Sequence, residues 1–358
     1  MKFKKFSNGE NFTLGLELEV RILNKFDLTP CNEYEYIFQN INPKYKDNIT
    51  PEFLSSMIEI NSPIFYENKN LISFLKEITN DLKKIAKEKD LCIQTSGSFA
   101  QKSSNIKINS NNRYEKLYEE HQVLLDDFTI CGTHIHVGFK DSDKALKAYN
   151  YALYYLPLFV ALSASSAFYD SINTGIHSYR TKIFERLPKA SIPEYFETYE
   201  KMQDLYNLLN KSNVINSTKD IWWDIRIQPH FKTIEFRICD AINDFERLEV
   251  IIDLLKVICK LSQIEKVIKM PMQVLKQNMW SATRYSISGN MVTNNGLETI
   301  RNVLSSIIIK AEDHCLLTKE SIQKAKELIE KKSIAQEMQE LYKKTKNLKD
   351  IDNLGVFK

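Results

Sequence analysis

The chain has 358 residues, enough for one large or two ordinary domains with a sizeable buried core. Its 43% hydrophobic and 27% charged content is typical of a soluble globular protein, and a net charge of +3 gives no indication of nucleic-acid or membrane binding. Residues 1–6 are basic but lack the apolar run of a secretory signal, so we expect a cytoplasmic protein.

Two common nucleotide-binding motifs are absent from the sequence. The chain has nine glycines and contains neither Gly-x-Gly-x-x-Gly nor Gly-x-x-x-x-Gly-Lys-Ser/Thr. This excludes a Rossmann fingerprint and a P-loop. If the protein uses ATP, metal ions and side chains must therefore hold the phosphates.

The first predicted strand covers residues 12–23. From Leu16 onward, Glu17, Glu19 and Arg21 alternate with apolar residues, which is the period of a strand. Two glutamates at i and i+2 share a face and raise each other's pKa unless a cation lies nearby. That cation is either Arg21, on an ordinary exposed face, or a bound metal ion, and this strand alone leaves both open.

The next elements alternate between strand and helix patterns. Residues 52–63 predict a strand that ends at Pro63 and carries Glu59 between two isoleucines, a position typical of the solvated side of an amphipathic strand. Residues 70–89 have apolar side chains at helical spacing and predict a packing helix. Residues 91–99 predict a strand that runs into a loop of small residues.

A histidine pair marks the following strand. Residues 113–125 predict a helix, and residues 129–139 predict a strand with His134 and His136 on one face. Two imidazoles at this spacing are either metal ligands or a hydrogen-bonded pair, and nothing local decides between them. The chain has no His-Glu-x-x-His helix, so a zinc protease of that type is excluded.

A long apolar segment then leads to a basic loop. Residues 141–167 predict a helix that is kinked at Pro157, and its most apolar part, residues 151–162, is too short to span a bilayer and is expected to be buried. Residues 176–188 predict a loop in which Arg180 is either a ligand for carboxylate or phosphate or a surface residue. Residues 193–209 predict another helix.

Residues 222–240 predict two strands joined by a Pro-His turn. The alternation places Asp224, Arg226, Glu235 and Arg237 on one face and the apolar residues on the other. A face that carries both charge signs is either solvated surface or a site. The recurrence of this pattern on several strands favours a site.

The remainder of the chain is predicted to be mainly helical. Residues 244–269 form a long amphipathic helix, and residues 280–289, which include Arg284, form a turn-rich segment. Residues 297–358 are expected to be helical, with many lysines. Because no repeat or flexible linker interrupts the chain, residues 1–358 predict one α+β domain with helices packed on one face of a mainly antiparallel sheet.

The polar faces of four predicted strands carry acids or an imidazole. Together these faces present Glu17, Glu19, Glu59, His134, Glu235 and Arg237. On a sheet whose other face is covered by helices, these residues would line one concave surface. Several carboxylates gathered there are costly unless divalent cations neutralise them. A carboxylate-rich site with one histidine and an adjacent arginine suits Mg²⁺, or alternatively Mn²⁺, bridging phosphate oxygens.

Six motifs, in order and spacing, resemble the bacterial glutamate-cysteine ligase type 2 (carboxylate-amine ligase) family. They cover most of the chain, about residues 10–290, and none is specific by itself. The motifs are LGLELE at 14–19, MIEI at 57–60, HIHVG at 134–138, Arg180 with RLP at 186–188, WDIR at 223–226 and TIEFRICD at 233–240.

The resemblance implies a glutamine-synthetase-like fold, in which a curved antiparallel sheet forms a funnel with helices on its outer face. It implies that ATP phosphorylates the side-chain carboxylate of glutamate and that an amine, cysteine in the best-known case, attacks the acyl phosphate. The implied partners are these small molecules, ATP and Mg²⁺, and the implied pathway is glutathione biosynthesis. A homodimer is compatible with the family, and the C-terminal helices either cap the funnel or form a subunit interface.

The resemblance also implies roles for individual residues. The implied metal ligands are Glu17, Glu19, Glu59, His134 and Glu235. Arg237 is implied to meet the transferring phosphoryl group, with Glu235 beside it in the catalytic set. The implied substrate or phosphate anchors are Arg180, Arg226 and Arg284.

One departure from the family leaves the amine open. Relatives often carry Gly-Thr-His-Pro where this chain has Ser96 to Phe99, so this loop is expected to affect the acceptor or glutamate pocket. Three alternatives remain: a ligase with the same chemistry and a different amine, a non-catalytic relative that binds nucleotide or amino acid, and a metal hydrolase built on the two histidines. The absence of a third imidazole on a neighbouring strand makes the hydrolase the weakest alternative.

Overall fold

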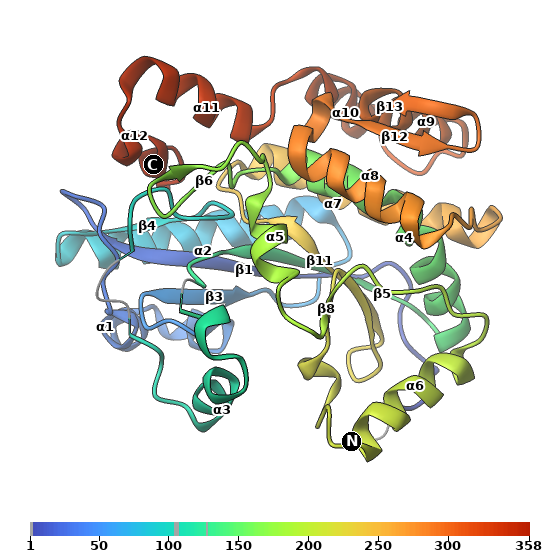
Figure 1. Cartoon of the computed structure of the whole chain (residues 1–358), viewed down its shortest axis with the longest axis horizontal. Helices are drawn as coiled ribbons and strands as arrows, with labels where there is room; N and C mark the ends of the chain where they lie inside the picture. Colours follow the sequence, from blue (N-terminus) through green and yellow to red (C-terminus); the bar gives the residue numbers. More distant parts are fainter. Residues whose placement is uncertain (1–2, 104–106, 127) are drawn as a thin grey trace.

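The structure is a computed structural model that describes residues 3–103, 107–126 and 128–358 (Figure 1). Met1 and Lys2 of the basic N-terminal stretch therefore lie outside the described residues. Among the helices that are described, none combines the length and the apolar character needed to cross a membrane.

An antiparallel sheet of seven strands forms the centre of the molecule. Six strands lie in the order β10 (Ile225–Gln228), β11 (Thr233–Asp240), β5 (Gly132–Gly138), β1 (Leu14–Asn24), β3 (Met57–Asn61) and β2 (Ile49–Pro51), and β4 (Leu91–Gln94) pairs with β1. Within the described residues this sheet is open, with β10 and β2 at its edges. The prediction of a mainly antiparallel sheet is confirmed, whereas closure into a funnel stays a prediction.

Three long helices cover the apolar face of the sheet (Figure 1). They are α2 (Asn68–Glu88), α4 (Ser142–Ser163) and α7 (Phe245–Ile264). The alternation in β1 explains which face they cover, because Leu16, Leu18, Val20 and Ile22 are at most 2% exposed. Burying each such side chain contributes roughly 1.5–3 kcal/mol, so the period-two pattern fixes the orientation of the strand.

The remaining elements surround this core. The other helices are α1 (Tyr34–Asn40), α3 (Asn112–His121), α5 (Tyr179–Phe184), α6 (Tyr199–Lys211), α8 (Met272–Tyr285), α9 (Ile300–Asp313), α10 (Lys319–Glu330), α11 (Ile334–Thr345) and α12 (Leu348–Leu354). Three two-stranded sheets pair β6 (Phe168–Tyr169) with β7 (Ile172–Asn173), β8 (Ala190–Ser191) with β9 (Trp222–Trp223), and β12 (Asn290–Thr293) with β13 (Gly296–Thr299).

Three local predictions are wrong. The segment 176–188 was expected to be a loop, but it contains the short helix α5. Residues 280–289 were expected to be turn-rich, but α8 continues to Tyr285. The hairpin of β12 and β13 reaches into the region expected to be entirely helical.

Residues 352–357 fasten the loop that follows β4. The carbonyl of Gly355 accepts from Thr95 N at 2.9 Å, and the Asp352 carboxylate accepts from Ala100 N at 2.7 Å and Gln101 N at 3.0 Å. The Asp352 carboxylate is buried, and burial raises its pKa to about 6. The segment therefore completes the structure on one side of residues 95–101.

Candidate functional site

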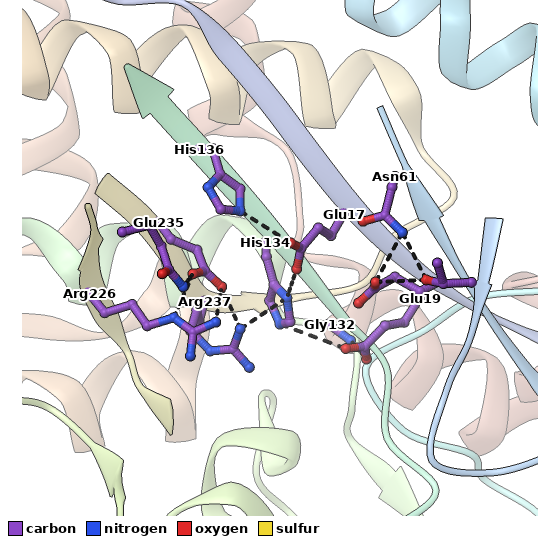
Figure 2. Close-up of polar contacts among 12 residues, drawn as sticks. Glu17, Glu19, Asn61, Gly132, His134, His136, Arg226, Glu235 and Arg237 are labelled. Atoms are coloured by element: carbon purple, nitrogen blue, oxygen red, sulfur yellow. Dashed lines mark hydrogen bonds and ion pairs between the residues drawn. The ribbon is translucent and has the colours of Figure 1, made fainter. Parts of the chain in front are cut away.

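A cavity of about 470 Å³ lies over the polar face of the central strands. Its walls come from β1, β3, β5, β10 and β11 and from the helices α3 and α5. Figure 2 shows the polar side chains of these strands pointing toward one another. The face that alternation alone could have left solvated is therefore enclosed, and Glu235 on β11 is fully buried.

Register explains why the acidic residues meet. Glu19 on β1 lies opposite Glu59 on β3, and Glu17 on β1 lies opposite His134 on β5. Residues that are directly opposite each other in a sheet point to the same face. Two strand pairings thus bring four residues together, although Glu17 and His134 are 117 positions apart in the sequence.

Glu17 lies between two imidazoles. Its Oε2 atom is 2.8 Å from His134 Nδ1, and its Oε1 atom is 3.3 Å from His136 Nε2. Burial would raise the pKa of Glu17, but the hydrogen bonds with both histidines outweigh burial and hold this pKa well below its usual range. Burial and the charge of Arg237 lower the pKa of His134 to about 4, so this imidazole is neutral at pH 7.

Three further carboxylates lie close together without an arginine between them. Glu19, Glu52 and Glu59 have ligand oxygens within 4.8 Å of one another. Burial, reinforced by the neighbouring carboxylates, raises the pKa of all three, most strongly that of Glu52. Glu19 accepts from Gly132 N at 2.6 Å, and Glu59 accepts from Asn61 Nδ2 at 3.0 Å. The charges of Arg180 and Arg237 lower the pKa of Glu19 in part, but burial outweighs them, so the negative charge of this group is only partly compensated.

The acidic residues fit a divalent cation. Carboxylate oxygens with one imidazole are a donor set that Mg²⁺ and Mn²⁺ accept. Glu17, Glu59 and His134 also place ligand atoms within 4.8 Å of one another. The Nε2 atom of His134 is buried and, within the described part of the chain, has no hydrogen-bond partner. An orphaned imidazole nitrogen facing several carboxylates is what a metal ligand requires.

Glu235 is compensated in a different way. Arg226 donates to it through Nε at 2.6 Å and Nη2 at 3.0 Å, Gln228 donates at 2.8 Å, and Arg237 donates through Nη1. Burial would raise the pKa of Glu235, but the two guanidinium groups outweigh burial and lower it strongly. Glu235, Glu17 and His136 do form a third group with ligand atoms within 4.8 Å of one another, so a metal role for Glu235 stays a prediction.

Two arginines keep donors for an anion. Arg237 and Arg180 both line the cavity, and the Nε atom of each is buried without a partner among the described residues. Arg180 lies directly against Gly132, since a Cβ atom there would be 2.1 Å from Arg180 Nη2. Glycine at position 132 therefore lets the guanidinium group cross β5 beside the acidic residues.

The other two predicted anchors differ from Arg180. Arg226 lines the cavity, but it donates hydrogen bonds to Glu235 and to the carbonyls of Thr218 and Ile221, which suits a structural role. Arg284 is not among the residues that line the cavity; it lies in the last turn of α8 with its guanidinium 4.8 Å from the Tyr285 ring centre. The structure thus separates Arg284 from the site.

The sequence did not single out several features of the cavity. Glu52 begins the segment 52–63 that predicted a strand, but it lies between β2 and β3, and the alternation that places Glu59 on a polar face does not extend to it. His136, which its spacing from His134 had marked as a candidate ligand, is not among the residues that line the cavity. An apolar wall also lines the cavity; its members are Leu117, Leu125, Phe128, Ile130, Phe184, Leu187 and Trp222.

The loop at residues 96–99 lies in the interior of the protein, outside the lining of the cavity. All four residues are buried, and none lines the cavity. Ser96 O accepts from Arg21 Nη1 at 3.0 Å, and Ser98 Oγ donates to Phe168 O at 2.6 Å. The side chains of this loop therefore pack into the protein interior, and an effect of the loop on the acceptor or glutamate pocket stays a prediction.

Comparisons with known proteins agree with this geometry. A family model described as glutamate-cysteine ligase family 2 matches residues 13–350. A Bdellovibrio bacteriovorus relative, provisionally named glutamate-cysteine ligase 2, is 31% identical over 320 residues, covering 84% of this chain and 83% of its own. A Solibacter usitatus relative with the same provisional name is 32% identical over 253 residues, covering 69% of this chain, which spans 66% of that relative's length.

A solved structure has the same fold. The glutamate-cysteine ligase of Francisella tularensis in complex with AMP superposes with a TM-score of 0.65 at 12% identity, covering 97% of this chain and 89% of that chain. At this identity the likeness shows the fold alone.

Proposed function

The chain belongs to glutamate-cysteine ligase family 2 and is an ATP-dependent ligase of that type, and we propose that it joins the γ-carboxylate of glutamate to an amine, with cysteine as the first candidate. One observation carries the proposal: only partly compensated carboxylates and arginines with spare donors face the same cavity. ATP-dependent amide formation needs both kinds of residue, because cations held by carboxylates and the arginines themselves must together surround the transferring phosphoryl group.

In the proposed first step, a γ-carboxylate oxygen of glutamate attacks the terminal phosphorus of ATP, and ADP leaves. In the second step the amine nitrogen attacks the acyl phosphate carbon, the amine loses a proton, and inorganic phosphate leaves. Neither step needs a protein nucleophile, so the contribution of the protein is alignment and charge. The carboxylates and arginines that line the cavity support both contributions.

Glu17, Glu19, Glu52, Glu59 and His134 would hold Mg²⁺. Bound there, the cation supplies positive charge to the phosphate oxygens. The neutral state of His134 suits this role, because Nδ1 can donate to Glu17 while Nε2 keeps a lone pair.

Arg237 and Arg180 would bind the anionic groups of the substrates beside these carboxylates. Glu235 holds Arg237 by an ion pair and accepts from Arg226, so the guanidinium of Arg237 is fixed before substrate arrives. A charge that is already in place costs no reorganisation during the reaction.

The apolar wall of the cavity bears on the identity of the amine substrate. The apolar wall beside Arg180 includes Phe128 and Phe184, whose ring centres are 5.5 Å apart, and it can receive a small, weakly polar side chain such as that of cysteine. An amine with a different apolar side chain is the second candidate, and the same wall supports it.

The testing experiment measures ADP release by the purified protein with ATP and Mg²⁺, scanning glutamate against a panel of amino acids and amines. ADP that requires glutamate and cysteine together, with γ-glutamylcysteine as product, supports the proposal in full. ADP with another amine retains the ligase and replaces cysteine. No ADP with any pair contradicts turnover and favours a relative that binds without catalysis.

A further inference from the structure

The buried carboxylate of Asp240 is the centre of a hydrogen-bond cluster next to the proposed site. Asp240 is the last residue of β11, and its side chain is fully buried. Its Oδ2 atom accepts from Ser166 Oγ at 2.7 Å and Ser165 N at 3.0 Å, and its Oδ1 atom accepts from Ser178 Oγ at 2.9 Å. Asp240 does not line the cavity, so it contacts no substrate there.

Two of these serines determine where α5 begins. Ser178 occupies the N-cap position of α5, but its hydroxyl donates to Asp240 and makes no capping hydrogen bond. Ser166 replaces it: the Ser166 hydroxyl accepts from Arg180 N at 3.0 Å while donating to Asp240. The backbone of Ser166 also accepts from Tyr179 N at 3.2 Å. The start of α5 is thus held from outside the helix, through Asp240.

Arg180 needs this support because α5 is short. Six residues give few internal hydrogen bonds, so the helix has little stability of its own. The Arg180 side chain must nevertheless pass Gly132, where a Cβ atom would be 2.1 Å from Nη2, and donate to the Arg237 carbonyl at 3.3 Å through Nη1. A small shift of α5 would break this fit.

We propose that Asp240 is a positioning residue for the ligase reaction: through the hydroxyls of Ser166 and Ser178 it fixes the first turn of α5 and thereby the guanidinium of Arg180. The catalytic part of this inference rests on the function proposed above. The structural part, that Asp240 orders α5, stands independently of it.

Asp240→Asn tests this hydrogen-bond cluster with little change in the shape of the side chain. An amide accepts hydrogen bonds only through its oxygen. At least one of the three groups that donate to Asp240 therefore loses its acceptor or has to reorient. Ser166→Ala is the second variant and removes the link to Arg180 N directly. Ser163→Ala is the matched control, because this buried serine accepts from Asp240 N at 3.2 Å but makes no hydrogen bond to α5.

The first readout is hydrogen exchange, which does not depend on catalysis. Peptides covering residues 178–184 should exchange faster in Asp240→Asn and Ser166→Ala than in the wild type, with no change in Ser163→Ala. Unchanged exchange in both variants would overturn the proposal. Should Asp240→Asn fail to fold, Ser166→Ala alone decides the result.

The second readout is a double-mutant cycle with Arg180→Ala, using ADP release. Asp240→Asn should lower kcat/KM for the same substrate, glutamate or ATP, that Arg180→Ala affects, by about ten-fold, and should add less than about two-fold in the Arg180→Ala background. Fully additive losses would mean that Asp240 acts on the fold in general, and would refute the positioning role. If the wild type itself releases no ADP with any amine, the proposed function fails, while the exchange result still decides whether Asp240 orders α5.

Discussion

Glu17 and His134 face each other across β1 and β5, with 2.8 Å between Oε2 of the carboxylate and Nδ1 of the imidazole. The contact to the carboxylate is shorter than the 3.4 Å contact from Arg237 Nη1 to the same Nδ1 atom, so it favours the tautomer in which Nδ1 carries the proton and Nε2 keeps its lone pair. Glu17 thereby orients His134 in addition to offering its own oxygens.

Glu17→Gln tests this pair. We expect the Mg²⁺ concentration for half-maximal ADP release to rise by about ten-fold or more, because the variant loses a ligand charge and the partner that orients His134. The measurement is a Mg²⁺ titration at saturating ATP and glutamate. Glu327→Gln on α10, where the glutamate is exposed, is the control. A titration that matches the wild type would remove Glu17 from the proposed ligands.

Arg237→Ala tests the proposed phosphoryl contact. We expect turnover to fall by about 10²-fold or more, because removal of a preorganised positive charge costs this much in comparable sites. Arg237→Lys keeps the charge and should recover part of the rate. Steady-state ADP release gives both values, and a rate within about two-fold of wild type for Arg237→Ala would contradict the assignment.

Glu235→Gln should reduce stability as well as activity. The substitution leaves Arg226 and Arg237 buried without a negative partner, and breaking a buried ion pair from one side costs about 3–5 kcal/mol. Gln228→Ala is the comparison, since it removes one hydrogen bond to the same carboxylate and should cost only about 1 kcal/mol. Urea unfolding measures both, and equal losses in the two variants would show that the ion pairs matter little.

Gly132→Ala should displace Arg180. The added methyl group would overlap the guanidinium, whereas a Cβ at Gly15, on the neighbouring strand, would be an ordinary 3.5 Å from His136 Cβ. We expect Gly132→Ala to lower kcat/KM by about ten-fold or more and Gly15→Ala to change it little. Similar kinetics for the two variants would mean that Arg180 needs no fixed path across β5.

Asp352→Asn should change the pH dependence of stability. Burial raises the pKa of Asp352 to about 6, above the roughly 3.9 of an unfolded chain, so the folded protein holds this proton more tightly. The corresponding stability is present below about pH 4 and is lost as the pH rises toward 6. Asp352→Asn should therefore show a smaller decline in unfolding free energy over this window than wild type, with Asp313→Asn at the surface as control. Parallel curves for wild type and Asp352→Asn would contradict this.

The strands that carry the site could be predicted because their period of two is local. Glu17, Glu19, Glu59 and His134 fell on polar faces by alternation alone, and the structure brings all four to one cavity. Alternation could not reveal that this polar face is enclosed, because enclosure depends on α3 and α5, which pack over it through tertiary contacts.

Other features had weaker or unused signals. The hairpin of β12 and β13 turns at Asn294 and Asn295, and Gly296, which directly follows them, has a φ of +107°; an Asn-Gly pair of this kind is typical of tight hairpins. That signal lies directly before residues 297–358, the segment that was expected to be helical. By contrast, α5 has no apolar periodicity of its own, and its position depends on Asp240, which lies 62 residues from Ser178.

The attachment of residues 352–357 has a consequence for the order of folding. The hydrogen bond from Ala100 N to Asp352 joins residues 252 positions apart. During synthesis the N-terminal part of the chain emerges first, so residues 95–101 must wait for almost the whole chain before their amide groups find these acceptors. Contacts between residues so far apart in the sequence form late, because the entropy cost of closing the loop between them comes before any stabilisation from the contact. Nascent chains should therefore collapse around β1, α2 and β4 well before the loop beside Asp240 becomes ordered.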